Sequence, residues 1–257
     1  MAASGGPGAA PAVAAGAAVF DLDGTITGRD TFQGFLISAL LRSPARWARA
    51  PLLVWAVGLF ALGRRDNHRL KAFFLRHIVG GQPGVRVARL AASHVRSVLK
   101  TEVQPRALAE VERHRAAGAR LVLASASPDV YTRPLGAALG FDAVVCTEVE
   151  RDGEGRPTGR LRGGNCYGEE KRRRVERLLR AEGLDWGDVT AYSDHHADLP
   201  LLRVAGIGYA VDPSPRLRRE AVAAGWPVLD WHEARRGPRP WPWGGPRASA
   251  VTRSPSV

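Results

Sequence analysis

Short apolar runs alternate with amphipathic stretches over most of the chain after residue 100, and one further apolar run lies near the N-terminus. The apolar runs, which predict buried strands, lie at 17–21, 119–124, 143–146, 189–193 and 207–211. The amphipathic stretches, which predict helices, lie at 105–117, 128–139, 169–181, 196–204 and 215–224. Alternating strands and helices are typical of a parallel sheet with helical crossovers. The pattern therefore predicts an α/β fold.

Two segments interrupt this alternation. Between residues 31 and 101 the pattern is helical and contains no convincing strand. The segment 147–161 carries Asp-Gly and Glu-Gly between short β-like arms, which predicts a hairpin. We therefore expect residues 17–30 and 102–234 to form the α/β core, and residues 31–101 to form a helical cap inserted after the first strand.

The two ends of the chain differ from this middle part. Residues 1–16 are rich in Ala, Gly and Pro and lack both the basic start and the leucine-rich core of a signal peptide, so we expect a disordered leader. From residue 235 onward Pro, Arg, Ser and Gly dominate, which predicts a disordered tail over 235–257.

The basic excess of the chain comes almost entirely from arginine. Lysine and arginine number 37 against 25 acidic residues, a formal net charge of +12, and only Lys71, Lys100 and Lys171 are lysines. This preference, together with abundant Ala and Gly, indicates coding bias in a GC-rich genome rather than selection for a ligand. A basic surface still favours anionic partners. Because the arginines are scattered, we expect no nucleic-acid partner.

Two further features bear on location. The apolar run Pro51–Leu62 is shorter than the roughly 20 residues that a membrane-spanning helix needs, so it predicts a buried helix or, less favoured, peripheral membrane contact. Cys146 and Cys166 form neither a disulfide framework nor a CxxC metal site. A reducing cytoplasm fits these features.

The strongest chemical signal follows the first apolar run. Asp21 and Asp23 flank Leu22 and precede Gly24 and Thr25, at a strand end where open α/β sheets place ligands. One carboxylate can attack phosphorus, while the other, if its pKa is raised, can protonate the leaving oxygen and later deprotonate water. The alternative is that the two aspartates only shape a turn. The strand-end position favours catalysis.

A serine and a lysine offer groups that could bind a phosphoryl oxygen. Ser125 follows Leu-Val-Leu-Ala and precedes Ala126 and Ser127 at an expected helix start, where hydroxyl and amide groups can hold an anion; the alternative for either serine is a helix N-cap. Lys171 precedes three arginines, which indicates a need for a compact ammonium between a carboxylate and a phosphoryl oxygen. Its alternative is a solvated helix residue.

The run 189–193 delivers a second acidic group. Mg²⁺ prefers oxygen ligands and usually keeps waters beside one or two carboxylates. Asp194, Asp21 and the main-chain carbonyl of Asp23 could supply the protein ligands. His195 and His196 raise zinc as an alternative, but adjacent histidines point in different directions and no third ligand has suitable spacing.

Four stretches taken together resemble the ordered motifs of the haloacid dehalogenase (HAD) superfamily. They are Phe20-Asp21-Leu22-Asp23-Gly24-Thr25, Ala124-Ser125-Ala126-Ser127, Lys171, and Ser193-Asp194 with Asp198. The helical insertion and the Pro-Thr-Gly-Arg-Leu stretch before the lysine resemble the type IB, phosphoserine phosphatase-like branch. The resemblance covers about residues 17–230 and implies a doubly wound, HAD-like (Rossmannoid) parallel-sheet core with a helical cap.

The resemblance also implies a role for each matched residue. Asp21 would be the nucleophile, and Asp23 would be the general acid and base. Ser125, the backbone at Ala126, and Lys171 would bind the phosphoryl oxygens. Phosphoryl transfer would then pass through an aspartyl phosphate.

The end of the last motif and the start of the insertion are less regular. Asp198 would orient the metal shell or the motif lysine. His195, His196 and Ala197 replace the Gly-rich, Asn-containing stretch typical of phosphoserine phosphatases proper, which weakens an assignment to phosphoserine. Asp30 stands where those enzymes carry a cap glutamate that reads the amino group of the substrate; it could read an amine or hydroxyl, or only cap the helix that follows.

These observations predict a Mg²⁺-dependent phosphomonoesterase for a small phosphorylated metabolite, such as a phosphoserine-like amino or polyol phosphate. Histidinol phosphate and lipid phosphate are alternatives with the same mechanism, and a phosphotransferase or phosphonate-cleaving enzyme could share the nucleophile. An alternative of another class is a noncatalytic basic protein that binds nucleic acid or acidic membranes. The physiological substrate and the oligomeric state stay open at this point.

Overall fold

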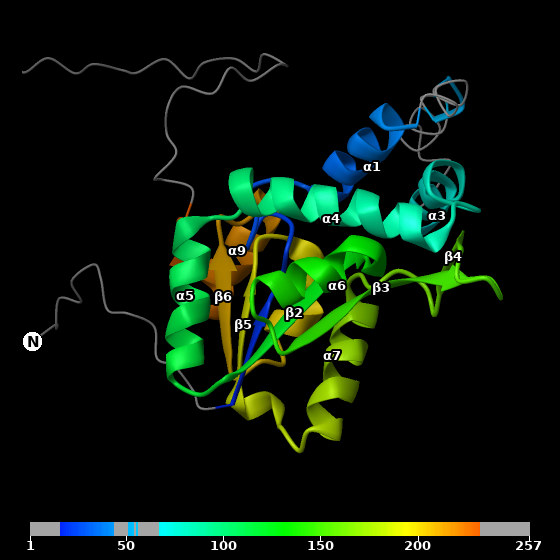
Figure 1. Cartoon of the computed structure of the whole chain (residues 1–257). Helices are drawn as coiled ribbons and strands as arrows, with labels where there is room; N and C mark the ends of the chain where they lie inside the picture. Colours follow the sequence, from blue (N-terminus) through cyan, green and yellow to red (C-terminus); the bar gives the residue numbers. More distant parts are fainter. Residues whose placement is uncertain (1–15, 44–50, 54, 56–66, 232–257) are drawn as a thin grey trace, which may run out of the picture.

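A seven-stranded sheet forms the centre of the computed structural model, which describes residues 16–43, 51–53, 55 and 67–231 (Figure 1). Its order is β4-β3-β2-β1-β5-β6-β7, and every pair is parallel except β3 with β4. The strands are β1 (Ala17–Phe20), β2 (Arg120–Pro128), β3 (Ala143–Arg151), β4 (Pro157–Arg162), β5 (Val189–Ser193), β6 (Ile207–Val211) and β7 (Val228–Leu229). The prediction of an α/β fold with a parallel sheet is confirmed.

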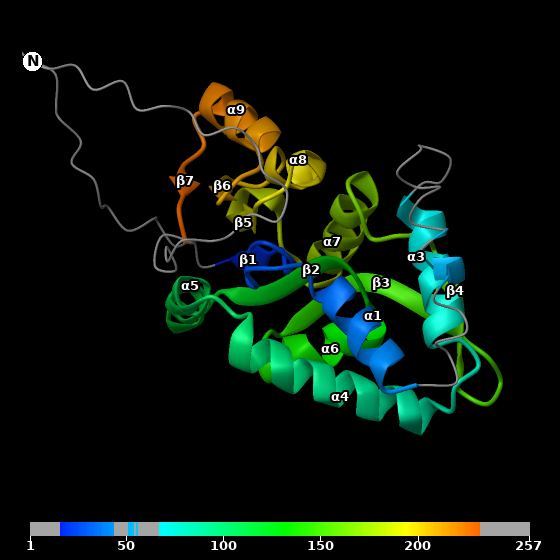
Figure 2. The ribbon, with the colours of Figure 1, turned by 90° about the horizontal axis from the view of Figure 1, so that it is seen from above.

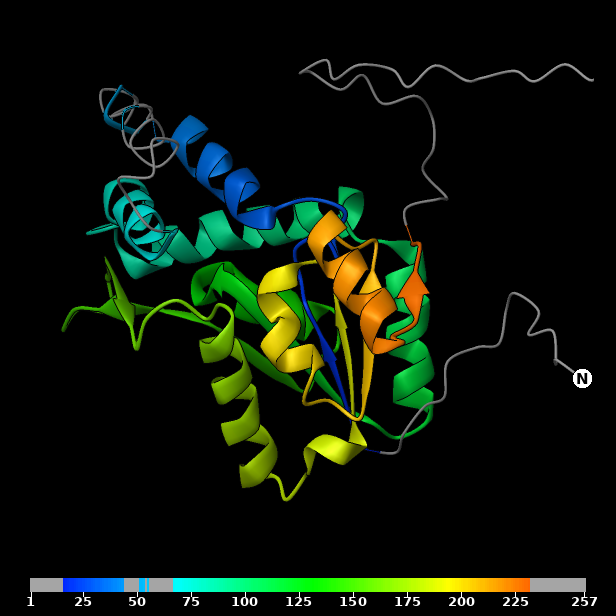
Figure 3. The same cartoon turned by 180° about the vertical axis from the view of Figure 1, so that it is seen from behind.

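Helices cover both faces of this sheet (Figures 2 and 3). On one side lie α4 (Gly84–Thr101), α5 (Pro105–Ala116) and α6 (Asp129–Ala138); on the other lie α7 (Glu169–Ala181), α8 (Leu199–Leu202) and α9 (Pro215–Ala224). The first side packs around large rings such as Phe20, Phe35 and Tyr131, which are fully buried. The second side is mainly aliphatic, with Val175 and Leu179 of α7 against the sheet. Two apolar layers therefore enclose the strands, as a doubly wound fold requires.

The chain reverses its direction of travel across the sheet at β1. From β1 it proceeds outward through β2 and β3 on one side, and later through β5 and β6 on the other. A crevice opens at such a switch point, outside the carboxyl ends of the strands. Asp21 and Asp194 directly follow β1 and β5, and Ser125 lies in the last part of β2, so the topology brings them to the same edge.

The described part of the segment 31–101 contains α1 (Thr31–Leu41), α3 (Asn67–Ile78) and α4. α4 packs along α6, and α3 packs against β4. Gly159 of β4 permits the second contact, because a Cβ there would lie 2.3 Å from the Arg76 Cα. The inserted helices thus contact both the α/β core and the β3–β4 hairpin.

Several local predictions need correction. β2 runs on to Pro128 and α6 begins at Asp129, so the serines after Ala124 lie on the strand and cap no helix. The helix expected at 196–204 is a 3-10 turn at His196–Asp198 followed by the four residues of α8. β3 extends past Cys146 because its second half pairs with β4, which places the predicted hairpin at the edge of the sheet.

The expected leader up to residue 15 and the expected tail from residue 235 lie outside the described residues, as does most of the apolar run Pro51–Leu62. Among the residues that are described, no helix is long and apolar enough to cross a membrane.

Candidate active site

A buried lysine joins two carboxylates, one directly after β1 and one in the 3-10 turn that follows β5. Lys171 Nζ lies 2.8 Å from Asp21 Oδ1 and 2.7 Å from Asp198 Oδ2, and all three side chains are at least nine-tenths buried. Ser193 Oγ also donates to Asp198 Oδ2, at 2.7 Å. Lys171 comes from the first turn of α7, where burial selects the slim ammonium over the arginines used elsewhere on that helix. The lysine is therefore a fixed part of the site.

Three carboxylates compete for this single cation. Burial raises the pKa of Asp21 to about 7, because Lys171 offsets only part of the effect of burial and of the neighbouring Asp198. Burial and the charges of Asp21 and Asp198 raise the pKa of Asp194 to about 8. Burial alone would lower the pKa of Lys171, but Asp198 and Asp21 outweigh it and raise that pKa well above its usual value. The site therefore has an excess of negative charge that a bound cation would relieve.

Asp23 is held by hydrogen bonds from two directions. The backbone N–H and the hydroxyl of Thr31 donate to Asp23 Oδ1 at 2.7 and 2.6 Å. Ser127 Oγ donates to Asp23 Oδ2 at 2.7 Å, and Ser125 Oγ lies 3.5 Å from the same atom. Since Thr31 is the first residue of α1, the carboxylate is tied to the inserted segment as well as to β2. Thr31 belongs to none of the motifs found in the sequence.

A pocket of about 330 Å³ opens over these groups. It is lined by Asp21, Asp23, Asp30, Phe32, Lys71, Ala126, Ser127, Tyr167, Lys171, His195, Ala197 and Asp198. Ser125 is fully buried beneath it, and its Oγ accepts the backbone N–H of Ser127. The second motif thus presents Ala126 and Ser127 to the pocket, whereas Ser125 supports them from below.

Asp30 caps the helix that follows it, one of the two roles predicted for it, and its side chain also lines the pocket. Its Oδ1 accepts the backbone N–H groups of Phe32 and Gln33 at 2.8 and 3.1 Å, so it caps α1. The same side chain lines the pocket. Burial and the charge of Asp23 raise its pKa.

Lys71 of α3 is a pocket residue that the sequence analysis missed. Its Nζ donates to the Ala126 carbonyl at 2.5 Å and to Asn165 Oδ1 at 2.9 Å, which leaves one ammonium proton for a ligand. Burial lowers its pKa to about 8, while Asp23 and Asp30 oppose that shift. The rarity of lysine in this chain, which drew attention to Lys171, applied equally to Lys71.

The residues that would bind Mg²⁺ fit a cation on two observations. Asp194 Oδ1 is buried and has no hydrogen-bond partner, and burial, together with the charges of neighbouring carboxylates, raises the pKa values of both Asp21 and Asp194. Among the described residues no three His, Cys, Asp or Glu side chains gather as a metal site. The protein ligands would be these two carboxylates and the Asp23 carbonyl, with water completing the shell.

Gly24 brings the loop after β1 against Asp194. Its φ is +91°, and a Cβ there would lie 2.2 Å from Asp194 Oδ2. Gly24→Ala should therefore displace this carboxylate and lower kcat/KM by about 10²-fold, the usual scale for a misplaced catalytic group. Gly155→Ala is the control, because Gly155 also has a positive φ, +73°, and a Cβ at that position meets open space. If steady-state kinetics gave both variants the kcat/KM of the wild type, activity would not depend on the exact position of the Asp194 carboxylate.

His195 turns toward its own backbone. Its Nδ1 accepts the N–H of Ala197 at 3.2 Å, and its ring lies tilted against that of His196, with the ring centroids 4.1 Å apart. Burial and the adjacent His196 lower the pKa of His195. The ring therefore contributes a neutral polar wall to the pocket.

The chain is similar in sequence and in fold to known proteins. The family model described as haloacid dehalogenase-like hydrolase matches residues 18–203. The inhibition of morphological differentiation protein of Streptomyces azureus is 31% identical over 228 residues, covering 84% of this chain and 78% of that protein. Phosphoserine phosphatase SerB1 of Mycobacterium tuberculosis is 28% identical over 232 residues, covering 87% and 73%. A solved structure from Bordetella pertussis Tohama I, of a protein with unknown function, is 29% identical with a TM-score of 0.75 and covers 84% and 98%.

Proposed function

The chain belongs to the haloacid dehalogenase-like hydrolases, and from this membership we propose that it is a Mg²⁺-dependent phosphomonoesterase in which Asp21 is the nucleophile. The observation that carries the proposal is the buried arrangement of Asp21, Lys171 and Asp198 beside Asp194, whose Oδ1 has no hydrogen-bond partner. A buried lysine between two carboxylates places positive charge where phosphoryl oxygens would bind. This arrangement suits phosphoryl transfer.

The chain's own residues divide the work in two steps. A carboxylate oxygen of Asp21 attacks phosphorus, the bond from phosphorus to the ester oxygen breaks, and Asp23 gives its proton to that oxygen. Asp23 then takes a proton from water, whose oxygen attacks the aspartyl phosphate and releases inorganic phosphate and free Asp21. Lys171 and the backbone at Ala126 stabilise the phosphoryl oxygens throughout. When bound, Mg²⁺ supplies further positive charge at the phosphoryl group.

A trapping experiment tests the metal and the intermediate together. Phosphate release from a panel of phosphomonoesters should require Mg²⁺ and should stop when EDTA is added. Acid quenching during turnover of a ³²P-labelled substrate should leave label on the protein that hydroxylamine removes, because an aspartyl phosphate is an acyl phosphate. Label that resists hydroxylamine, or release that continues in EDTA, would contradict the mechanism.

The polar groups at the mouth of the pocket favour a substrate that carries both charges. Lys71 presents a cation and Asp30 an anion, in a pocket of about 330 Å³ that suits a small molecule. A small phosphorylated amino acid would offer a carboxylate to Lys71 and an amine to Asp30. Phosphoserine is therefore our first candidate within the amino and polyol phosphates, and the name of the mycobacterial relative supports it.

Paired substrates separate the two contacts. Lys71→Met should raise the KM for O-phosphoserine at least about tenfold, the scale of one lost charged hydrogen bond, and should change the KM for phosphoethanolamine, which lacks the carboxylate, by less than about threefold. Asp30→Asn keeps the helix cap. This variant should raise the KM for both amines, O-phosphoserine and phosphoethanolamine, and should leave the KM for 3-phosphoglycerate unchanged. If Lys71→Met changes all three KM values equally, the lysine only ties α3 to the core.

The panel also tests the remaining alternatives. Histidinol phosphate has the amine without the carboxylate, whereas lysophosphatidate has a long acyl chain. If the enzyme hydrolysed either compound faster than phosphoserine, that compound would become the candidate substrate and the proposed mechanism would be unchanged.

We also place the enzyme in the cytoplasm, because Cys146 and Cys166 are free thiols, as is usual in a reducing compartment.

A further inference from the structure

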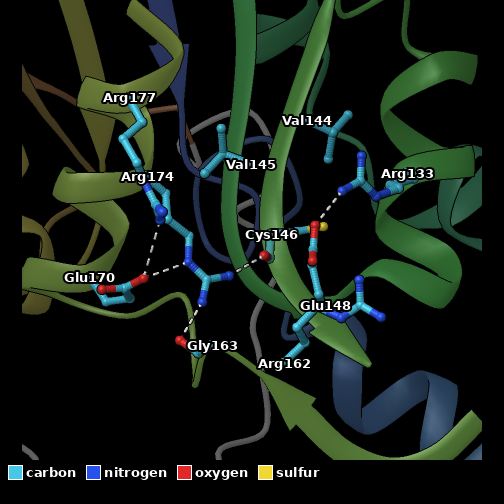
Figure 4. Close-up of a pocket in the computed structure, with 10 residues that line it drawn as sticks. All are labelled: Arg133, Val144, Val145, Cys146, Glu148, Arg162, Gly163, Glu170, Arg174 and Arg177. Atoms are coloured by element: carbon cyan, nitrogen blue, oxygen red, sulfur yellow. Dashed lines mark hydrogen bonds and ion pairs between the residues drawn. The ribbon is translucent and has the colours of Figure 1, made fainter. Parts of the chain in front are cut away.

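A second pocket, of about 460 Å³, lies at the edge of β3 between α6 and α7 (Figure 4). It shares no lining residue with the pocket over Asp21. Four arginines surround it: Arg133 from α6, Arg162 from β4, and Arg174 and Arg177 from α7. Three separate elements on either side of β3 therefore bring guanidinium groups to one place.

Two carboxylates oppose these four guanidinium groups, so the pocket keeps a net positive charge. Arg133 lies 2.8 Å from Glu148, and Arg177 lies 3.6 Å from Glu170. The side chains of Arg133 and Arg177 are still 52% and 72% exposed. No hydrogen bond or ion pair joins the exposed Arg162 side chain to another described residue. Three guanidinium groups are thus accessible to a ligand, and one of them has no internal partner.

Arg174 gives the pocket a fixed wall. Its side chain is only 11% exposed and donates to the carbonyls of Cys146 and Gly163, at 2.8 and 2.7 Å, and to Glu170 at 2.8 Å (Figure 4). These bonds hold the loop after β4 against the edge of β3. A ligand would therefore meet a preformed cavity, which lowers the cost of binding.

We propose that this arginine pocket is a second binding site, for a small metabolite that carries at least two phosphate or carboxylate groups. Arginine binds both groups through two parallel hydrogen bonds. The cavity volume falls in the range of small-molecule sites. A ligand with two anionic groups can engage Arg162 together with Arg177 or Arg133, whereas a single anion would compete poorly with Glu148 and Glu170.

The site is also linked to the catalytic pocket. Arg174 follows Lys171 by one turn of α7, and the loop that it holds continues to Asn165, whose Oδ1 accepts hydrogen bonds from Lys71 and Thr147. Binding in the arginine pocket is therefore expected to stabilise this loop and the first turns of α7. Hydrogen exchange can detect that change without any catalytic assay.

Calorimetric titration of the metal-free protein with inorganic tripolyphosphate and with citrate tests the proposal and separates phosphate from carboxylate ligands. Arg162→Ala/Arg177→Ala should weaken binding of the preferred anion at least about tenfold. Arg180→Ala is the matched control, because Arg180 is on the same helix, is 76% exposed and pairs with Glu176 at 2.7 Å, but lies outside the pocket. This control should bind within about twofold of wild type.

A gain of binding provides a second measurement. Glu148→Gln removes a competing carboxylate and should strengthen binding of the same anion severalfold. In hydrogen exchange, the anion should protect residues 144–148, 160–165 and 174–178. The proposal is wrong if the wild type binds neither anion, if Arg180→Ala weakens binding as much as the double variant, or if protection is confined to 21–31 and 125–127.

Discussion

Asp21→Asn should lower kcat for phosphate release at least about 10³-fold, the scale seen when a covalent nucleophile is removed. Asparagine has almost the same shape as aspartate and can still accept a hydrogen bond from Lys171, but its amide is a very weak nucleophile. The fold should survive, because the raised pKa of Asp21 shows that its charged form is costly in this buried place. We therefore expect a melting temperature equal to or above that of the wild type.

Asp185→Asn is the matched control for this substitution. Asp185 is exposed, and its side chain caps nothing, so the control should keep wild-type kinetics. Single-turnover ³²P labelling should find label on the control and none on Asp21→Asn. If the kcat of Asp21→Asn were within about tenfold of that of the wild type, a residue other than Asp21 would be the nucleophile.

Lys171→Met should have the largest effect on stability. The ammonium is 3% exposed and contacts both Asp21 and Asp198. Methionine would leave these two carboxylates, with Asp194 nearby, buried without a cation. Breaking a buried ion pair by removing one partner costs about 3–5 kcal/mol, and phosphate release should be lost as well. Chemical denaturation in EDTA gives the free energy of unfolding without stabilisation by metal.

Two further variants test whether Lys171→Met lowers stability through the loss of its positive charge or through other effects of the substitution. Lys100→Met removes an exposed lysine of α4 and should leave the free energy of unfolding within about 0.5 kcal/mol of wild type. Lys171→Met/Asp198→Asn removes one stranded carboxylate, so it should recover part of the lost stability while phosphate release stays absent. Equal instability of the single and double variants would show that packing, rather than charge, makes Lys171 necessary.

The regular elements of the core were predictable because their patterns are local. The strands at 189–193 and 207–211 and the helices at 169–181 and 215–224 have the bounds that the sequence predicts. Each strand is a continuous apolar run that is buried on both faces, and each helix has a clear start and a polar outer side. Where a partner strand decides the length, as in β3 beside β4, prediction stopped short by several residues.

The catalytic motifs were visible because parallel strands align their carboxyl ends. Asp21 after β1 and Asp194 after β5 had to meet once these strands became neighbours. The role of Ser125 beneath the pocket, with Ser127 facing it, depended on how far β2 continued. Local sequence could not give that length, because it reflects pairing with β3.

The sequence by itself determined the class of fold and the set of groups that carry the chemistry. Both the apolar periodicity and the carboxylates at strand ends are local signals, which can be recognised within a few residues. Only the tertiary structure decided that Lys71 and Thr31, from the inserted helices, reach the site. It alone decided that arginines from α6, β4 and α7 share a pocket. The physical reason is that contacts between elements distant in the chain depend on packing angles and loop paths, which leave no periodic trace in the sequence.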